Sequence, residues 1–192
     1  MSRLLLAVGL VAFVVACGDA DLVRKANDGD AKAQYELSHA YREGKGVSVD
    51  LQSAYKWLRL AADGGYAEAQ YELAKEFVVE AERNRPTAKL GVGTAIQYFS
   101  RNYGLAADLF SKAAEQGHAQ SEYELARLYF AGWGLQVNDA MAKEWAEKAK
   151  AQGVKEAEQL LADMSAGKRP EKGFGDVRAN PAGGMGRSGV SF

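Results

Sequence analysis

The chain has 192 residues, of which 26% are charged and 47% are hydrophobic, and its formal net charge at pH 7 is −1. This composition fits one globular or repeat domain and excludes a disordered or fibrous chain. The small net charge provides no field that would favour nucleic acid or a membrane surface, so we expect no nucleic-acid partner.

The first segment has the layout of a secretory signal. A short basic start precedes a continuous apolar run from Leu4 to Ala16. This run is too short to span a bilayer as a stable helix, and small residues follow it. We therefore expect residues 1–16 to be removed as a signal peptide.

The end of the apolar run predicts where the mature chain begins. Val14-Val15-Ala16-Cys17 resembles the lipobox of bacterial lipoproteins. The resemblance implies that Cys17 is lipidated, that residues 17–21 form a lipidated linker, and that the protein is anchored in the cell envelope facing the periplasm. A lone cysteine can also be a small buried hydrophobe or a nucleophile, but Cys17 ends the apolar run and is not part of a periodic helix. Gly18 after the cysteine favours the outer membrane, although Asp19 leaves sorting between the two membranes open.

The rest of the chain is dominated by an internal repeat. Ala33–Leu37 (AQYEL) recurs as Ala69–Leu73 at an offset of 36 and as Ser121–Leu125 at a further 52, with a fainter copy 36 residues later at Ala157–Leu161. A second and independent marker, a glycine, follows the same spacing at Gly29, Gly65, Gly117 and Gly153.

Each repeat predicts a pair of helices. Ala33, Leu37 and Tyr41 form one apolar stripe of helical spacing, and a second stripe surrounds Ala54 and Trp57. Between the helices, glycines are available for a left-handed turn. Large and small residues return at fixed places, as close packing of neighbouring helices requires, so we expect the aromatics among them to be core residues. The returning residues are Gly44 with Gly132, Gly46 with Gly134, Trp57 with Trp145, and Ala54 with Ala106 and Ala142.

The unit Asp30–Gly65 resembles a Sel-one-like (Sel1-like) repeat, a relative of the tetratricopeptide repeat. The resemblance rests on its Ala-Gln-Tyr-x-Leu start, its Gly44-x-Gly46-Val47 turn, Trp57 and its Ala-Ala-x-x-Gly end. It implies an all-α fold, a right-handed α-solenoid over residues 22–166, with half units at both ends acting as caps. Solenoids of this family are built for protein–protein contact.

The second unit is interrupted, because its spacing of 52 exceeds 36 by 16 residues. We expect an insertion over residues 84–104, with the second helix resuming near Gly104. The segment Gly91-Val92-Gly93 is not a nucleotide loop, because it lacks a third glycine, a following Lys-Ser or Lys-Thr and a preceding strand. The insertion is either a tolerated surface loop or a carrier of partner anchors. Its aromatic residues could instead fold back as a short helix, from Thr94 to about Asn102, that caps the neighbouring groove. The candidate anchors are Tyr98, Phe99, Arg101 and Tyr103.

A second candidate surface lies on the outward face of the first helices. Each repeat has an acid three residues before a base: Glu36 with His39, Glu72 with Lys75, and Glu124 with Arg127. Such pairs usually stabilise a solvated helix face, and a binding ridge is the second interpretation. From Gly167 onward the chain is rich in glycine and basic residues without helical period, so we expect residues 167–192 to form a disordered tail.

The sequence offers little for catalysis. Its two histidines, His39 and His118, have no spacing that suggests a shared metal site. We therefore expect no enzyme, no cofactor, no metal and no small-molecule substrate. The preferred hypothesis is a lipid-anchored adaptor that holds another envelope protein. The alternative, implied by family resemblance, is an immunity protein that neutralises an antibacterial effector such as a type VI secreted lipase; a role in cell-wall or polysaccharide assembly is a third option.

Overall fold

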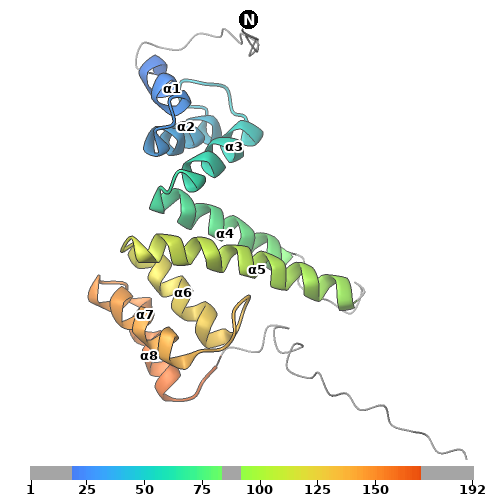
Figure 1. Ribbon diagram of the computed structural model, residues 1–192, viewed down its shortest axis with the longest axis vertical. Helices are drawn as coiled ribbons and strands as arrows, with labels where there is room; N and C mark the ends of the chain where they lie inside the picture. Colours follow the sequence, from blue (N-terminus) through green and yellow to red (C-terminus); the bar gives the residue numbers. More distant parts are fainter. Residues whose placement is uncertain (1–18, 84–91, 170–192) are drawn as a thin grey trace, which may run out of the picture. The chain divides into compact units, whose positions relative to one another are not determined.

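The computed structural model describes residues 19–83 and 92–169, and in these ranges all regular secondary structure is α-helical (Figure 1). The chain divides into two compact units, Met1–Gly64 and Gly65–Phe192. The described helices of the first unit are α1 (Asp19–Asn27), α2 (Ala31–Glu43) and α3 (Leu51–Asp63), and those of the second are α4 (Ala67–Arg83), α5 (Val92–Glu115), α6 (Ala119–Ala131), α7 (Asp139–Ala151) and α8 (Glu156–Ser165).

The first unit is a helix pair with one extra helix. α2 begins at Asp30, whose side chain accepts a hydrogen bond from the Ala33 N–H at 2.9 Å and so satisfies a donor that the helix leaves free. α2 packs against both α1 and α3. Between them lies a small apolar core of Ala26, Ala33 and Leu37, and Trp57 packs against it. Trp57 is thus partly buried against this core, at a repeat position where a core residue was predicted.

The turn between paired helices is the same in both units that have it. Gly44 ends α2 with φ 73°, and Gly132 ends α6 with φ 73°. A side chain at either glycine would be strained by this left-handed backbone and would also meet a valine, Val49 or Val137, at 2.9 and 2.6 Å. The glycine turn expected from the sequence is therefore confirmed, with a second reason for glycine that the sequence did not reveal.

The second unit contains the largest core. α4 packs against α5, α5 against α6, and α6 against α7, with α8 as a single helix beside α7 and α6. Small and large residues alternate here as expected, since Ala106 and Ala142 are fully buried beside Trp145. The bulk of this core is aromatic and aliphatic and includes Phe99, Tyr103, Phe110, Leu125 and Leu128.

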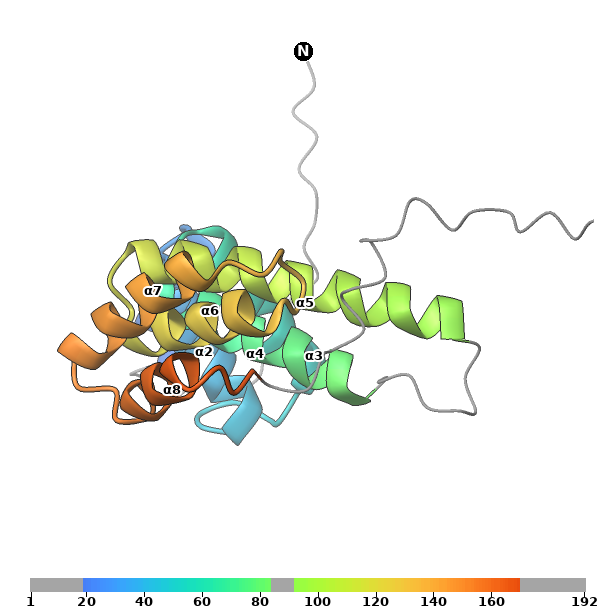
Figure 2. The ribbon, with the colours of Figure 1, turned by 90° about the horizontal axis from the view of Figure 1, so that it is seen from below.

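The predicted course of the insertion is wrong. α4 continues to Arg83, and α5 runs without a break from Val92 to Glu115 as a helix of 24 residues, so the second helix does not begin near Gly104. The extra residues thus lengthen two neighbouring helices, and no separate short helix precedes a new start at Gly104 (Figure 2). Gly93 lies inside α5, and residues 84–91 lie outside the described part of the chain.

Gly104 and Gly134 explain how the long helix fits its neighbours. The turn after α6 lies so close to α5 that a side chain on Gly134 would come within 2.4 Å of the Tyr103 carbonyl carbon. Gly134 also has φ 70°, so both backbone conformation and space require glycine. The repeat glycines Gly46, Gly65, Gly117 and Gly153 likewise have positive φ.

The structured part is slightly longer than expected at both ends. α1 begins at Asp19, inside the expected linker 17–21. At the other end Arg169, expected in the disordered tail, pairs with both Asp139 carboxylate oxygens at 2.9 Å, donates to the Phe130 carbonyl and lies over the Phe130 ring. Residues 1–18, including Cys17, and residues 170–192 lie outside the described residues.

Candidate interaction surface

Three first helices, α2, α4 and α6, carry the same group of three side chains, which we name the Tyr-Glu-base triplet. A base four residues after a tyrosine packs on its ring, and a glutamate lies between them in sequence. The three triplets are Tyr35, Glu36 and His39 on α2; Tyr71, Glu72 and Lys75 on α4; and Tyr123, Glu124 and Arg127 on α6.

The third triplet is the most tightly assembled. The Arg127 guanidinium donates to Glu124 at 2.7 Å and lies 5.7 Å from the centre of the Tyr123 ring. Burial raises the pKa of the Glu124 carboxyl, and the charge of Arg127 opposes that rise. Glu124 is thus a half-buried acid that is paired with a cation.

The second triplet adjoins the third within the second unit. Lys75 lies over the Tyr71 ring, with its amino group 5.1 Å from the ring centre. Burial raises the pKa of the Tyr71 hydroxyl, with the negative charge of Glu124 adding to the effect, and Lys75 in turn helps to lower the pKa of Glu124. Tyr71 also stacks against His118 at 4.7 Å. Two triplets therefore form one continuous, mixed-charge and aromatic surface over α4 and α6.

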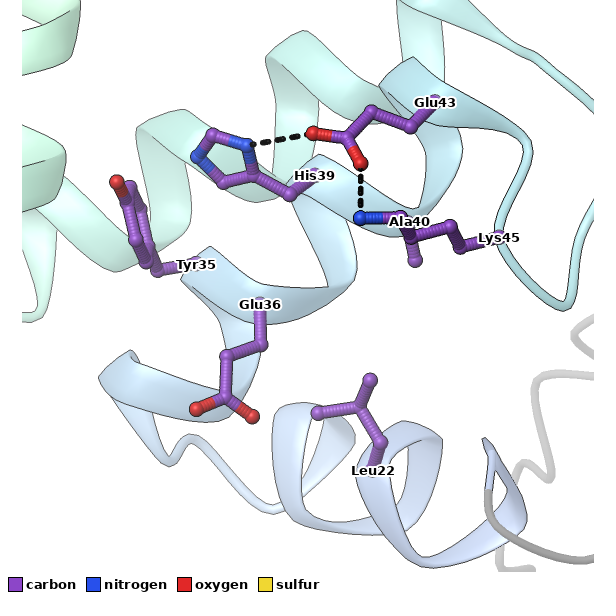
Figure 3. A pocket seen from close by; sticks show the side chains of 7 residues that line it. All are labelled: Leu22, Tyr35, Glu36, His39, Ala40, Glu43 and Lys45. Atoms are coloured by element: carbon purple, nitrogen blue, oxygen red, sulfur yellow. Dashed lines mark ion pairs between the residues drawn. The ribbon is translucent and has the colours of Figure 1, made fainter.

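The first triplet opens onto a hollow of about 500 Å³. His39 packs edge-on against Tyr35, with ring centres 4.6 Å apart, and its Nδ1 lies 3.7 Å from Glu43. Glu43 also pairs with Lys45 at 2.5 Å, and these pairs lower the pKa of the Glu43 carboxyl (Figure 3). The hollow is lined by Leu22 of α1 and by Tyr35, Glu36, His39, Ala40, Glu43 and Lys45.

The expected acid–base pairs are present only in part. Glu124 pairs with Arg127 as predicted, but Glu36 pairs with Lys32 at 3.9 Å, and His39 lies beside Glu43. The pairing of Glu36 with His39 was therefore wrong, because i,i+3 and i,i+4 neighbours are equally accessible on a helix and the rotamer decides between them. The tyrosine of each triplet was missed, although its recurrence at offsets of 36 and 52 was visible in the sequence.

The four candidate anchors of the insertion differ in how far their side chains are buried. Phe99 and Tyr103 are only 1% exposed and belong to the core, so the prediction that they are exposed anchors is wrong. Tyr103 donates to Glu82 at 2.5 Å and packs against Trp133. Tyr98 is 41% exposed and donates to Glu80 at 3.0 Å, and Arg101 is also exposed. Only Tyr98 and Arg101 thus remain available to a partner.

Two further observations concern the described residues. No group of three or more His, Cys, Asp or Glu side chains in residues 19–83 and 92–169 could hold a metal ion. Nor does any helix in those ranges combine the length and apolarity needed to cross a bilayer.

Comparison with known proteins identifies the repeat. The Sel1 repeat profile matches residues 31–66, 89–118 and 119–154. A crystal structure of a Sel1 repeat protein from Oxalobacter formigenes superimposes with a TM-score of 0.64 and 32% identity, covering 77% of this chain and 99% of that one.

Two curated relatives are more distant. The uncharacterized protein NMB1327 of Neisseria meningitidis is 28% identical over 141 residues, which cover 73% of this chain. The Sel1-like repeat-containing protein L21 of Acanthamoeba polyphaga mimivirus is 26% identical over 123 residues, or 57% of this chain. The matches span 23% and 26% of these relatives, so they share only about a quarter of their length with this chain.

Proposed function

Because the chain belongs to the Sel1 repeat family, we propose that it is a protein–protein interaction adaptor, held at the bacterial cell envelope by a lipid on Cys17 and facing the periplasm. Repeats of this family generally form protein–protein interaction scaffolds and typically carry no catalytic site. The observation that carries the proposal is the recurrence of the Tyr-Glu-base triplet on α2, α4 and α6, of which α2 and α6 lie inside matched repeats.

The triplets have the chemistry of a binding surface. Tyrosine and arginine are enriched where proteins meet, since they offer a large apolar area together with a polar group. Tyr71 and Tyr123 are half-buried, so their rings are already held in place by packing. A surface that is ordered before binding loses less conformational entropy when the partner arrives.

The adaptor function is tested by crosslinked affinity capture from envelopes of the native host. The wild-type chain is compared with Lys75→Glu, which reverses a charge on the triplet surface, and with the control Lys155→Glu, which reverses an exposed charge at the start of α8. We expect one envelope protein to be captured by the wild type and the control and to be lost with Lys75→Glu. Equal capture by all three chains would contradict a role for this surface.

The identity of the captured protein separates the two candidate roles. An antibacterial effector, such as a type VI secreted lipase, would favour the immunity role, and a resident envelope protein would favour the adaptor. The lipid anchor has its own test, in which the Cys17→Ala chain is fractionated. It should leave the membrane fraction, and its full retention there would contradict lipidation, while separation of the two membranes tests the proposed outer-membrane location.

A further inference from the structure

The three triplets are not equivalent, and their difference indicates what the hollow in the first unit binds. In the third triplet the tyrosine and glutamate hold a cation, the Arg127 guanidinium, which pairs with Glu124 and covers the Tyr123 ring. In the second triplet another cation, Lys75, lies over Tyr71. The second and third triplets thus show that a cationic side chain packs beside the tyrosine and glutamate of a triplet.

The first triplet has a histidine where the others have a lysine or an arginine. Its ring packs edge-on against Tyr35, with the ring centres 4.6 Å apart. His39 also lies beside Glu43, one turn further along the helix, at 3.7 Å. The ion pair of Glu36 in the described residues is with Lys32 at 3.9 Å, and both side chains are more than half exposed. Such a pair contributes little, because water screens it.

The remaining lining supports the same conclusion. Glu43 is already neutralised by Lys45, so Glu36 is the carboxylate of the hollow with the weakest compensation. Leu22 and Ala40 provide an apolar wall beside it, as Figure 3 shows. An apolar wall next to a carboxylate complements a side chain with an aliphatic stem and a cationic head.

We propose that this hollow binds an arginine or lysine side chain of the partner protein, with the cationic head on Glu36 and Tyr35 and the stem against Leu22 and Ala40. The bound cation would pair with Glu36 as Arg127 pairs with Glu124 in the third repeat. The volume of about 500 Å³ is sufficient for one long side chain and part of its backbone. This inference rests on the proposed adaptor function and names the chemistry of its partner.

The probe for this site is a short peptide, acetyl-Ala-Arg-(p-benzoylphenylalanine)-amide, photocrosslinked to the purified lipoprotein. Its control replaces arginine by citrulline, which has a similar shape but no charge. We expect adducts on α1 and α2 around Leu22 and Ala40, and a yield about threefold lower for the citrulline peptide, as expected for an ion pair on a half-exposed carboxylate.

Two variants test the assigned residues. Glu36→Gln should lower the yield about threefold, whereas the matched control Glu76→Gln, an exposed glutamate of α4, should not change it. His39→Arg recreates the third repeat inside the first, so its own guanidinium should fill the site and abolish labelling while leaving Glu36 in place. Circular dichroism checks that both variants remain helical.

The proposal is overturned if the citrulline peptide labels equally well, if the adducts map away from α1 and α2, or if either variant labels like the wild type. The adaptor function would survive that failure, because its capture test depends on Lys75 in the second unit. Conversely, labelling of the hollow with no captured partner would show a cation site without an adaptor.

Discussion

One buried acid provides a sharp test of the packing between repeats. Glu122 of α6 is only 4% exposed, and its Oε2 accepts a hydrogen bond from the Gln152 side-chain amide at 2.8 Å. One repeat earlier the same two positions are Gln70 and Gln116, whose amides are paired at 2.9 Å. The substitution Glu122→Gln therefore recreates a pair that the chain already contains.

The direction of the effect follows from the pKa. Burial raises the pKa of the Glu122 carboxyl above its ordinary value of 4.5, with the Gln152 hydrogen bond and Lys148 opposing the rise. A raised folded-state pKa means that the stability contributed by Glu122 is present below about pH 4.5 and is lost as the pH rises through the folded-state pKa. Replacing the carboxylate by an amide removes this loss, and we expect a gain of about 1 kcal/mol near pH 7.5, at the lower end of the cost of an imperfectly satisfied buried polar group.

The assay is urea denaturation of wild type and Glu122→Gln, followed by circular dichroism at pH 4 and pH 7.5. The gain should be present at pH 7.5 and small at pH 4. The reciprocal variant Gln70→Glu should lose stability at pH 7.5 and not at pH 4. Destabilisation by Glu122→Gln at pH 7.5, or a gain that is equal at the two pH values, would refute the reasoning.

Three further predictions concern other parts of the second unit and can be measured in the same way. Phe99→Ala should cost about 3–5 kcal/mol, whereas its exposed neighbour Tyr98→Ala should change stability by less than about 1 kcal/mol; similar losses would mean that Phe99 is not core. Gly134→Ala should be more destabilising than Gly153→Ala, because both have positive φ but only Gly134 has backbone atoms in the way, and equal losses would contradict the close approach to Tyr103. His118 caps α6 by accepting from the Ser121 N–H at 3.2 Å, and burial lowers its pKa below 6.5 with Glu68 opposing. The stability that His118 contributes should be full above about pH 6.5 and should fall as the pH drops below that value. The variant His118→Asp copies the Asp30 cap, so it should lose less stability than the wild type between pH 7 and pH 5. An unchanged pH dependence of stability in the variant would exclude this role of His118.

Much of the fold could be predicted because the repeat supplies independent copies of each position. The glycine turns at Gly44 and Gly132 and the packing of Trp57 and Trp145 were visible from spacing alone. In these places the local requirement, a left-handed backbone or a large buried ring, is the same in every copy. Agreement between the copies therefore supports the predicted local structure at each of these positions.

The insertion could not be placed in the same way, since it has no second copy. An offset of 52 gives the number of extra residues but does not say whether they form a loop or lengthen the helices. The correct signal was the apolar period, because Phe99, Tyr103, Ala106 and Phe110 continue one helical stripe across the expected break at Gly104. The aromatic character of Phe99 and Tyr103 suggested binding, whereas their period indicated burial.

The candidate surface was predictable only in outline. The glutamates of the triplets were found, but the partner of each depends on rotamers and neighbouring helices that no sequence rule fixes. Glu36 and Glu124 occupy the same repeat position, yet one pairs with Lys32 and the other with Arg127. The hollow in the first unit also depends on Leu22 of α1, which the sequence predicted only as part of a capping half unit, without the wall that Leu22 forms beside α2.

The central claim, that the first-helix surface contacts a partner protein, is tested most directly by site-specific photocrosslinking in the native host. A photoreactive amino acid replaces Lys75 on the triplet surface in one strain and Lys112, which is exposed on α5, in another. The account predicts that light produces a discrete adduct with one envelope protein from position 75 and none from position 112. An adduct from position 112 alone, or no adduct from position 75, would contradict it.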